Sequence, residues 1–383
     1  MNQNRAPLLE WGQSPDPRAI FYMPGHQRSG NVDPGLRTWL GDGPFQADIP
    51  ELPGVDGAIA AAEALAAEAF GAERTWLLTN GATGALQAAI LATVNPEDVV
   101  LVGRNQHRAA IAGLILSGAR PVYLPTAHRD GVDLGVTPEA LAQGLAAHPT
   151  AKAVLLVSPN YYGIVVDVGA CCRLAHGRGV PVIVDAAHGS HLRFHPALPE
   201  DALTAGADVV VHSLHKTGTA LSQGALLHHQ GKRVDGDRLA QAVAWLHSTS
   251  PNFALLASLD GARRQLVSVG ESHLSRILAG TADLRQTVDR LEGLATLHPA
   301  SVLGLDATRF TLLTAGLGRT GFAIDEILQN LGIVAEWPGW GHLTFVLTIA
   351  TPDPAIARLQ QTLPELVAHR RPQPLPQLPP PPI

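Results

Sequence analysis

Cysteine is almost absent from this chain, which has two cysteines in 383 residues, the neighbours Cys171 and Cys172. A disulfide between adjacent residues is strained, so we expect both to be free thiols. The N-terminal residues 1–5 also lack the apolar core of a signal peptide. These absences predict a protein of the reducing cytoplasm that does not depend on a disulfide framework.

Long basic runs and long apolar runs are missing as well. The formal net charge is −6 and no segment gathers lysine and arginine, which argues against a nucleic-acid-binding protein. Charge-free apolar stretches such as 109–119 are too short to span a membrane. The chain is instead 46% hydrophobic and 16% charged, so 383 residues can bury a large core. We expect two domains, or one large domain with an appendage, and neither a nucleic-acid nor a membrane partner.

Short apolar strands alternate with helical stretches through the first two thirds of the chain. The expected strands are 74–79, 99–102, 121–124, 153–157, 180–185, one beginning at Val209, and 224–228. The expected helices are 55–71, 83–93, 109–116, 138–147 and 168–176. This alternation predicts an α/β fold with a mostly parallel sheet and right-handed crossovers.

The pattern changes after residue 228. A mostly helical region, with a long helix at about 271–291, is followed by an expected small α+β unit. Its strands are expected at 307–313, 333–336 and 343–349, and its helix at 324–331. We therefore expect four parts: an N-terminal arm (1–55), a large cofactor-binding domain (56–268), a small C-terminal α+β domain (269–370) and a proline-rich tail (371–383).

Lys216 is the most informative residue. It follows the apolar strand that begins at Val209, in the polar sequence Ser213-Leu214-His215-Lys216, where an open α/β sheet places its ligand site. A desolvated lysine there can lose its proton and attack carbonyls. An earlier apolar strand ends in Asp185. An acid and a lysine at two strand ends suit a Schiff-base cofactor with a protonated ring nitrogen.

Further segments fit a phosphorylated pyridine. Gly81, Ala82 and Thr83 lie between a strand and a helix, where backbone N–H groups can cradle a phosphate. His107 follows the next strand and can stack on a flat heterocycle. The segment 158–163 ends a third strand and offers polar groups.

These motifs resemble the fold-type I pyridoxal-phosphate enzymes, and among them the ornithine/lysine/arginine decarboxylase family in its short form without the wing domain. The segments that carry the resemblance are Pro24-Gly25-His26, Thr79-Asn80-Gly81, Arg104-Asn105-Gln106-His107, Ser158-Pro159-Asn160-Tyr161-Tyr162-Gly163, Asp185-Ala186-Ala187-His188-Gly189, Ser213-Leu214-His215-Lys216, Gln223 and Thr249-Ser250-Pro251. The resemblance implies an aspartate-aminotransferase-like large domain, pyridoxal 5′-phosphate as cofactor, and a homodimer or higher homo-oligomer with shared active sites.

The resemblance also implies roles for single residues. Lys216 would hold the cofactor, Asp185 would keep its ring nitrogen protonated, and His215 would help to return a proton to the substrate. The rest of the implied cofactor set is His107 and Ala187 on the two ring faces, Gly81, Ala82, Thr83 and Ser213 at the phosphate, Asn160 and His188 nearby, and Ser250 reaching the partner subunit's phosphate.

The implied activity is decarboxylation of a basic amino acid, arginine first, then lysine or ornithine, feeding polyamine metabolism. Glu336, at the end of the expected strand 333–336 and beside Trp337, would bind the cationic head of the substrate.

Three alternatives remain at this stage. An aminotransferase or an aldolase or other lyase of the same fold type is possible, with Arg309, Arg319 or Arg358 available to bind a substrate carboxylate. A non-catalytic binding protein is a second alternative, against which the intact Lys216 and Asp185 argue. The spacing of His188, His191 and His195 suggests zinc, but Gly189 and Pro196 indicate a loop rather than a helix that would align the rings, so we expect no metal.

Overall fold

The structure, a computed structural model, describes residues 1–12, 34, 55–129, 131–298 and 304–376. The Pro24-Gly25-His26 segment and most of the expected N-terminal arm lie outside the described residues, as do residues 377–383 of the tail. In the described part of the arm, residues Pro7–Gly12 form helix α1. Among the described helices, none combines the length and the apolar character that a membrane crossing requires.

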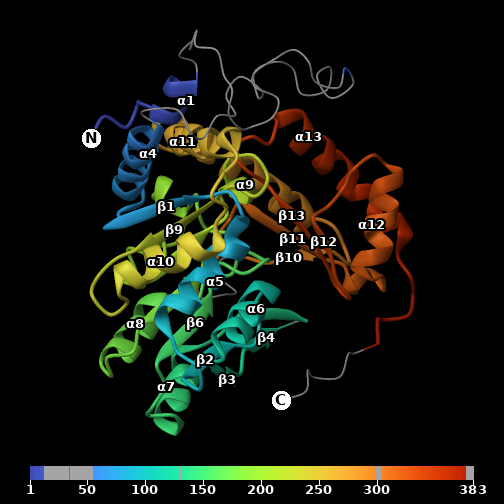
Figure 1. Cartoon of the computed structure of the whole chain (residues 1–383). Helices are drawn as coiled ribbons and strands as arrows, with labels where there is room; N and C mark the ends of the chain where they lie inside the picture. The colour runs from blue at the N-terminus through green and yellow to red at the C-terminus, as the bar shows by residue number, and fades with distance from the viewer. Residues whose placement is uncertain (13–33, 35–54, 130, 299–303, 377–383) are drawn as a thin grey trace.

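A seven-stranded sheet forms the centre of the molecule, in the order β1-β9-β8-β7-β6-β2-β3 (Figure 1). Its strands are β1 (Arg74–Leu78), β2 (Val99–Gly103), β3 (Arg120–Leu124), β6 (Ala153–Val157), β7 (Val182–Asp185), β8 (Val209–His212) and β9 (Ala225–His229). Strand β9 is antiparallel to β1 and β8, whereas the other neighbours are parallel. The expectation of a mostly parallel α/β sheet is confirmed.

Both faces of this sheet are covered. The covering helices are α4 (Val55–Phe70), α5 (Gly81–Thr93), α6 (Arg108–Ser117), α7 (Pro138–Ala147), α8 (Val168–His176) and α10 (Gly236–Leu246). Side chains alternate along β7, because Val182 and Val184 join the apolar cluster with α4, α7 and α8, while Ile183 joins the cluster with α5, α6 and α10. Burial on both faces explains why the central strands read as continuous apolar runs.

A second, smaller unit follows along the chain, in orange and red in Figure 1. Its antiparallel sheet has the order β10-β11-β13-β12. The strands are β10 (Ala295–Thr296), β11 (Arg309–Leu313), β12 (Trp337–Pro338) and β13 (His342–Val346), and the helices are α12 (Gly321–Asn330) and α13 (Asp353–Thr362). The expected strand 333–336 is wrong, because the strand in this region is the two-residue β12 that follows it.

The long helix α11 (Phe253–Val288) begins 18 residues before the expected start at Glu271, with Asn252 as its N-cap. Its first half, including Phe253 and Leu266, packs into the core of the large sheet. Its second half, including Ile277 and Leu284, packs into the core of the small unit. The proposed domain boundary after residue 268 therefore falls inside one continuous helix.

Candidate active site

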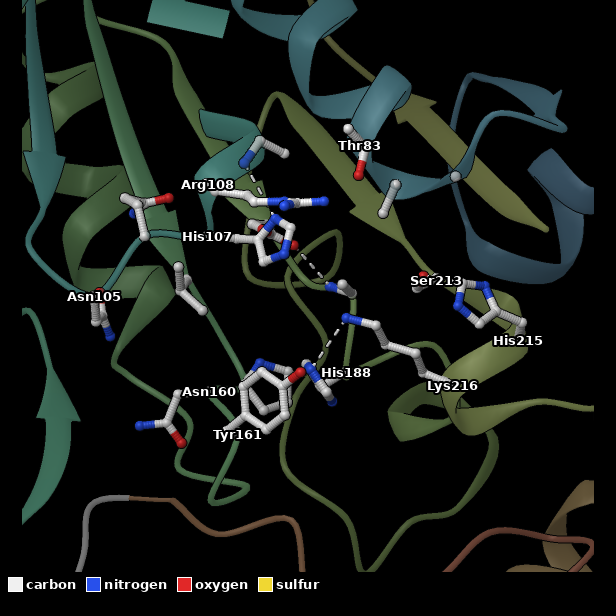
Figure 2. Close-up of a pocket in the computed structure, with 18 of the residues that line it drawn as sticks. Thr83, Asn105, His107, Arg108, Asn160, Tyr161, His188, Ser213, His215 and Lys216 are labelled. Atoms are coloured by element: carbon white, nitrogen blue, oxygen red, sulfur yellow. Dashed lines mark hydrogen bonds between the residues drawn. The ribbon is translucent and has the colours of Figure 1, made fainter. Parts of the chain in front are cut away.

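A cavity of about 940 Å³ opens at the carboxyl ends of the parallel strands. Figure 2 shows side chains that enter it from segments following different strands. The lining residues include Ala82 and Thr83 after β1, Asn105 and His107 after β2, Asn160 and Tyr161 after β6, Asp185, Ala187 and His188 at β7, and Ser213, His215 and Lys216 after β8. The sheet thus gathers most of the expected site residues in one place.

Lys216 lies in α9 (Leu214–Thr217), a single helical turn directly after β8, where the sequence indicated an irregular turn. Its Nζ lies 3.3 Å from Nε2 of His188. Burial lowers the pKa of Lys216, and the charge of Arg309 acts in the same direction, while Asp185 and Glu336 oppose the shift. The neutral, nucleophilic amine is therefore easier to form at Lys216 than at an exposed lysine.

Asp185 ends β7 and is 7% exposed. Its Oδ1 accepts a hydrogen bond from the Ala187 N–H at 3.1 Å. Burial raises the pKa of the Asp185 carboxyl, against the effect of that hydrogen bond and of the charges of Lys216 and His107. A buried carboxylate facing a cavity is suited to a cationic N–H donor on a ligand.

His107 is the N-cap of α6, and its Nδ1 accepts a hydrogen bond from the Ala109 N–H at 3.2 Å. Burial lowers the pKa of His107, which favours the neutral ring. A neutral ring whose Nδ1 accepts carries its proton on Nε2. The α6 cap therefore fixes the ring, which points into the cavity in Figure 2, in orientation and tautomer.

The N-terminus of α5 forms another wall of the cavity, with Gly81, Ala82 and Thr83 in its first turn. Gly81 has φ +78°, a conformation that favours glycine. The N-cap residue Asn80 makes no side-chain capping bond and donates instead to the Leu246 carbonyl. The first-turn amides thus stay available for an anion.

His215 and Ser213 lie beside Lys216. Nδ1 of His215 lies 3.2 Å from the Gly224 carbonyl, which can only accept, so this nitrogen carries the proton. Burial lowers the pKa of His215, so the ring is neutral and its Nε2 is left as a basic position. Ser213 is buried, with its Oγ 3.4 Å from Nδ1 of His215.

Asn160 lines the cavity, but its amide is engaged by backbone groups. Its Oδ1 accepts from the N–H groups of Tyr162 and Ile164, each at 3.0 Å, and its Nδ2 donates to the Asp133 carbonyl at 2.7 Å. These bonds hold the loop that carries Tyr161. The Asn160 side chain therefore shapes the cavity wall.

The structure gives Tyr161 and Arg309 contacts at the site that the sequence did not predict. The centroid of the Tyr161 ring lies 4.5 Å from that of the His188 ring and 5.4 Å from that of the Trp337 ring, so the three rings form an aromatic wall. Arg309 of β11 donates to Nδ1 of His188 at 3.2 Å. Tyr161 could have been found from the sequence, because it lies inside a motif that carries the family resemblance. The contact of Arg309 could not, because 121 positions separate it from His188.

Two expected residues stay outside this cavity. Ser250 lies between α10 and α11, exposed, and its N–H donates to Ser248 Oγ. Glu336 is exposed next to Trp337, which does line the cavity. Its charge nevertheless reaches the site, because it raises the pKa of Lys216.

The three histidines that suggested zinc have separate partners. His188 contacts Lys216 and Arg309. His191 lies 3.1 Å from Asp306, and His195 lies 2.9 Å from Ser275 Oγ. The three imidazoles thus face different elements, as expected for a loop.

Comparison with known proteins gives the family. A family model described as Orn/Lys/Arg decarboxylase, major domain, matches residues 14–322. The chain belongs to this family. Among curated relatives, an arginine decarboxylase of Halalkalibacterium halodurans is 34% identical over 81% of this chain and 66% of its own length. An arginine decarboxylase of Bacillus subtilis is 31% identical over 96% of this chain and 78% of its own length.

Solved structures show the fold. Lysine decarboxylase A from Pseudomonas aeruginosa has a TM-score of 0.81 at 22% identity, over 94% of this chain and 59% of that one. A ureidoglycine-glyoxylate aminotransferase from Bacillus subtilis has a TM-score of 0.65 at 15% identity, over 83% of this chain and 86% of that one. The aminotransferase-like fold expected for this family member is therefore confirmed. The chain spans about three fifths of the lysine decarboxylase and about two thirds of the Halalkalibacterium relative.

The residues present fit a phosphorylated pyridine. Open amides at the N-terminus of α5 suit a phosphate, the buried Asp185 carboxylate suits a ring N–H, and the Lys216 amine suits an aldehyde carbon. All three groups line the same cavity.

Proposed function

We propose that the protein is a pyridoxal-phosphate-dependent decarboxylase of a basic amino acid, with arginine as the preferred substrate. The observation that carries the proposal is the convergence of Lys216, Asp185 and the N-terminus of α5 on one cavity. The family match supports decarboxylation of a basic amino acid, and the names of the curated relatives support arginine in particular.

Each group has a defined task in this reaction. Lys216 would be the attachment point of the cofactor, Asp185 would keep a proton on its ring nitrogen, and His107 would pack against its ring. When bound, the cofactor supplies an electron-withdrawing ring that stabilises the negative charge left on Cα after CO₂ departs. The Lys216 amine or the neutral His215 then delivers a proton to Cα.

The wall of the cavity opposes the aminotransferase alternative. The three arginines considered as carboxylate clamps do not line the cavity. Arg309 is buried beneath His188, Arg319 donates to the His369 carbonyl, and Arg358 donates to the Leu331 carbonyl. None of these three arginines is therefore placed to hold a substrate carboxylate in the cavity, where the lining arginine is instead Arg108 at the start of α6.

The first experiment identifies the reaction. Cofactor-loaded protein is incubated with arginine, lysine and ornithine, and CO₂ and the amine are measured. Decarboxylation of arginine supports the proposal, while formation of a keto acid without CO₂ would reject it. Borohydride should fix the cofactor to the peptide that contains Lys216, and Lys216→Ala should abolish this labelling.

Substrate choice is assigned to Glu336. Its carboxylate lies near enough to influence the Lys216 amine and sits next to Trp337 in the cavity wall. We expect Glu336→Gln to lower kcat/KM for the preferred substrate by the equivalent of roughly 1.5–3 kcal/mol, the strength of a charged hydrogen bond. Unchanged kcat/KM would place the selectivity elsewhere.

The proposed working form is a cytoplasmic homodimer with shared sites. The support for sharing is the position of Ser250, which is exposed and outside its own chain's cavity. A catalytically active monomer in light scattering would contradict it.

A further inference from the structure

Arg309 is a buried cation whose side chain hydrogen-bonds to His188. It is 1% exposed, lies on β11 of the small unit, and does not line the cavity. Its Nη2 donates to Nδ1 of His188 at 3.2 Å, and its Nη1 lies 3.9 Å from Oδ2 of Asp306. Nε and Nη1 have no hydrogen-bond partner among the described residues. A buried arginine this poorly satisfied is unfavourable for folding, and its hydrogen bond to His188 points to a task there.

The hydrogen-bond chain has a definite direction. Guanidinium groups only donate, so Nδ1 of His188 must accept from Arg309. Burial, reinforced by the charges of Arg309 and Lys216, lowers the pKa of His188 well below its usual range, so the ring is neutral and its proton is on Nε2. This Nε2 lies 3.3 Å from Nζ of Lys216. An N–H donor at that distance needs an acceptor, and a lysine nitrogen accepts only as the uncharged amine.

We propose that Arg309 is a positioning residue which, through His188, holds the Lys216 amine in its uncharged form with its lone pair engaged by the His188 ring. The proposal deepens the function proposed above, because it explains how the residue that receives the cofactor is kept reactive. The small unit thereby takes part in preparing the lysine of the large unit.

Other groups also act on the Lys216 amine. The carboxylates of Asp185 and Glu336 favour the charged form. The rings of His107 and His188 and the Tyr161 ring, whose centroid lies 5.8 Å from Nζ, face it from the other loops. The two carboxylates and the Tyr161 ring favour the charged form of the amine, so an N–H donor at Nε2 of His188 is a specific counterweight.

The chain offers a clean test, because its lysines are Lys152, Lys216 and Lys232. Lys152 and Lys232 are exposed and serve as internal standards. The full-length chain, freed of bound cofactor, is acetylated with trace acetic anhydride at a series of pH values, and each lysine is quantified by peptide mass spectrometry. We expect Lys216 to react as the free amine at lower pH than the two standards.

Arg309→Met removes the donor while keeping most of the volume. The substitution should move the acetylation profile of Lys216 to higher pH by about one unit. Near neutral pH this corresponds to about a tenfold loss of labelling. Arg309→Lys, which keeps an obligate donor, should restore the profile to within roughly twofold. Arg263→Met is the matched control, because Arg263 is a buried arginine of α11 that donates to Asp260 and to the backbone carbonyls of Gln3 and Arg5.

A double-mutant cycle separates the effect of the hydrogen bonds through His188 from the direct effect of the Arg309 charge on Lys216. In a His188→Phe background, Arg309→Met should shift the labelling profile of Lys216 by clearly less than one pH unit, because only the direct charge effect of Arg309 on the Lys216 amine is then lost. The same one-unit shift in that background, or no shift in the single variant, would overturn the proposal.

Nitrogen NMR of ¹⁵N-histidine-labelled wild type decides independently of any variant's stability. His188 is assigned by subtracting the spectrum of His188→Phe. A proton on Nε2 alone supports the proposal, and a proton on Nδ1 or on both nitrogens refutes it. None of these readouts uses substrate, so a failure of decarboxylation would reject the proposed function and leave this inference standing.

Discussion

At the scale of one residue, the buried Asp185 carboxylate suits the cofactor but destabilises the folded chain when the cofactor is absent. Burial raises the pKa of this carboxyl in the cofactor-free chain, so the folded state binds the proton more tightly than the unfolded state does. The stabilisation from protonation is present below the ordinary pKa of about 4 and is lost as pH rises through the raised folded value. Above that raised value, the cofactor-free site holds a charge that burial disfavours.

Asp185→Asn should accordingly separate activity from stability. Turnover should fall by about 100-fold or more, the equivalent of roughly 3 kcal/mol of transition-state stabilisation, because the ring nitrogen loses its counter-charge. The cofactor-free variant should melt roughly 1–3 °C above wild type at pH 7, and the gap should close as the pH is lowered. Calorimetry at a series of pH values measures the change in melting temperature, and steady-state kinetics measures the loss of turnover. A variant that is less stable than wild type and fully active would contradict both expectations.

Gly163 gives a second prediction at this scale. It has φ +83°, and an added Cβ would lie 2.7 Å from Cγ of Arg309. Gly163→Ala should therefore lower the melting temperature and also displace Arg309, so that labelling of Lys216 moves toward higher pH. Gly179 is the matched control, since it has φ +72° and nothing within 4 Å of an added Cβ. Gly179→Ala should cost only the backbone strain of roughly 1–2 kcal/mol and leave the Lys216 profile alone.

The residues that could be predicted are those at strand ends. Lys216, Asp185 and His107 each follow an apolar strand, and parallel strands bring their carboxyl ends to one edge. Arg309 could not be assigned its role, because its contact with His188 depends on how the small unit packs on the large one. No local pattern encodes such a contact.

At the scale of elements, the N-terminus of α5 makes a testable anion site. Ala82→Asp places a carboxylate in the first turn, where it favours the helix by roughly 0.3–1 kcal/mol. The same charge should repel the cofactor's phosphate and weaken cofactor binding by at least roughly tenfold. Titration of the cofactor-free protein, followed by absorbance, measures the change. Ala82→Ser is the neutral control, and equal binding by both variants would place the phosphate elsewhere.

Element prediction succeeded where caps and apolar runs agree. Helix α7, with Thr137 as N-cap and Pro138 in its first turn, and helix α8, capped by Asp167, have the expected bounds. For α11 the expected helix was found, but its start was placed 18 residues too late; the earlier half packs in the core of the large unit, against α1 and α4. The two-residue β12 is too short for any periodic signal.

At the scale of the whole molecule, sharing of sites between two chains can be tested by complementation. Lys216→Ala and Ser250→Asp chains should each be inactive as homodimers. When the two are mixed and allowed to exchange, one site of each mixed dimer combines an intact Lys216 with an intact Ser250. Activity should rise to roughly a quarter of wild type for random two-fold pairing. No recovery in verified mixed dimers would show that Ser250 does not serve the partner's site.

Helix α11 has a consequence for how the molecule can move. One uninterrupted helix contributes side chains to both apolar cores, so a hinge between the two units would have to break main-chain hydrogen bonds or pull buried groups into water. The helix joins the two units rigidly and so helps to set the distance between Arg309 of the small unit and His188 of the large unit. We therefore expect the cavity to open through movements of the loops and side chains around it rather than through a hinge between the two units.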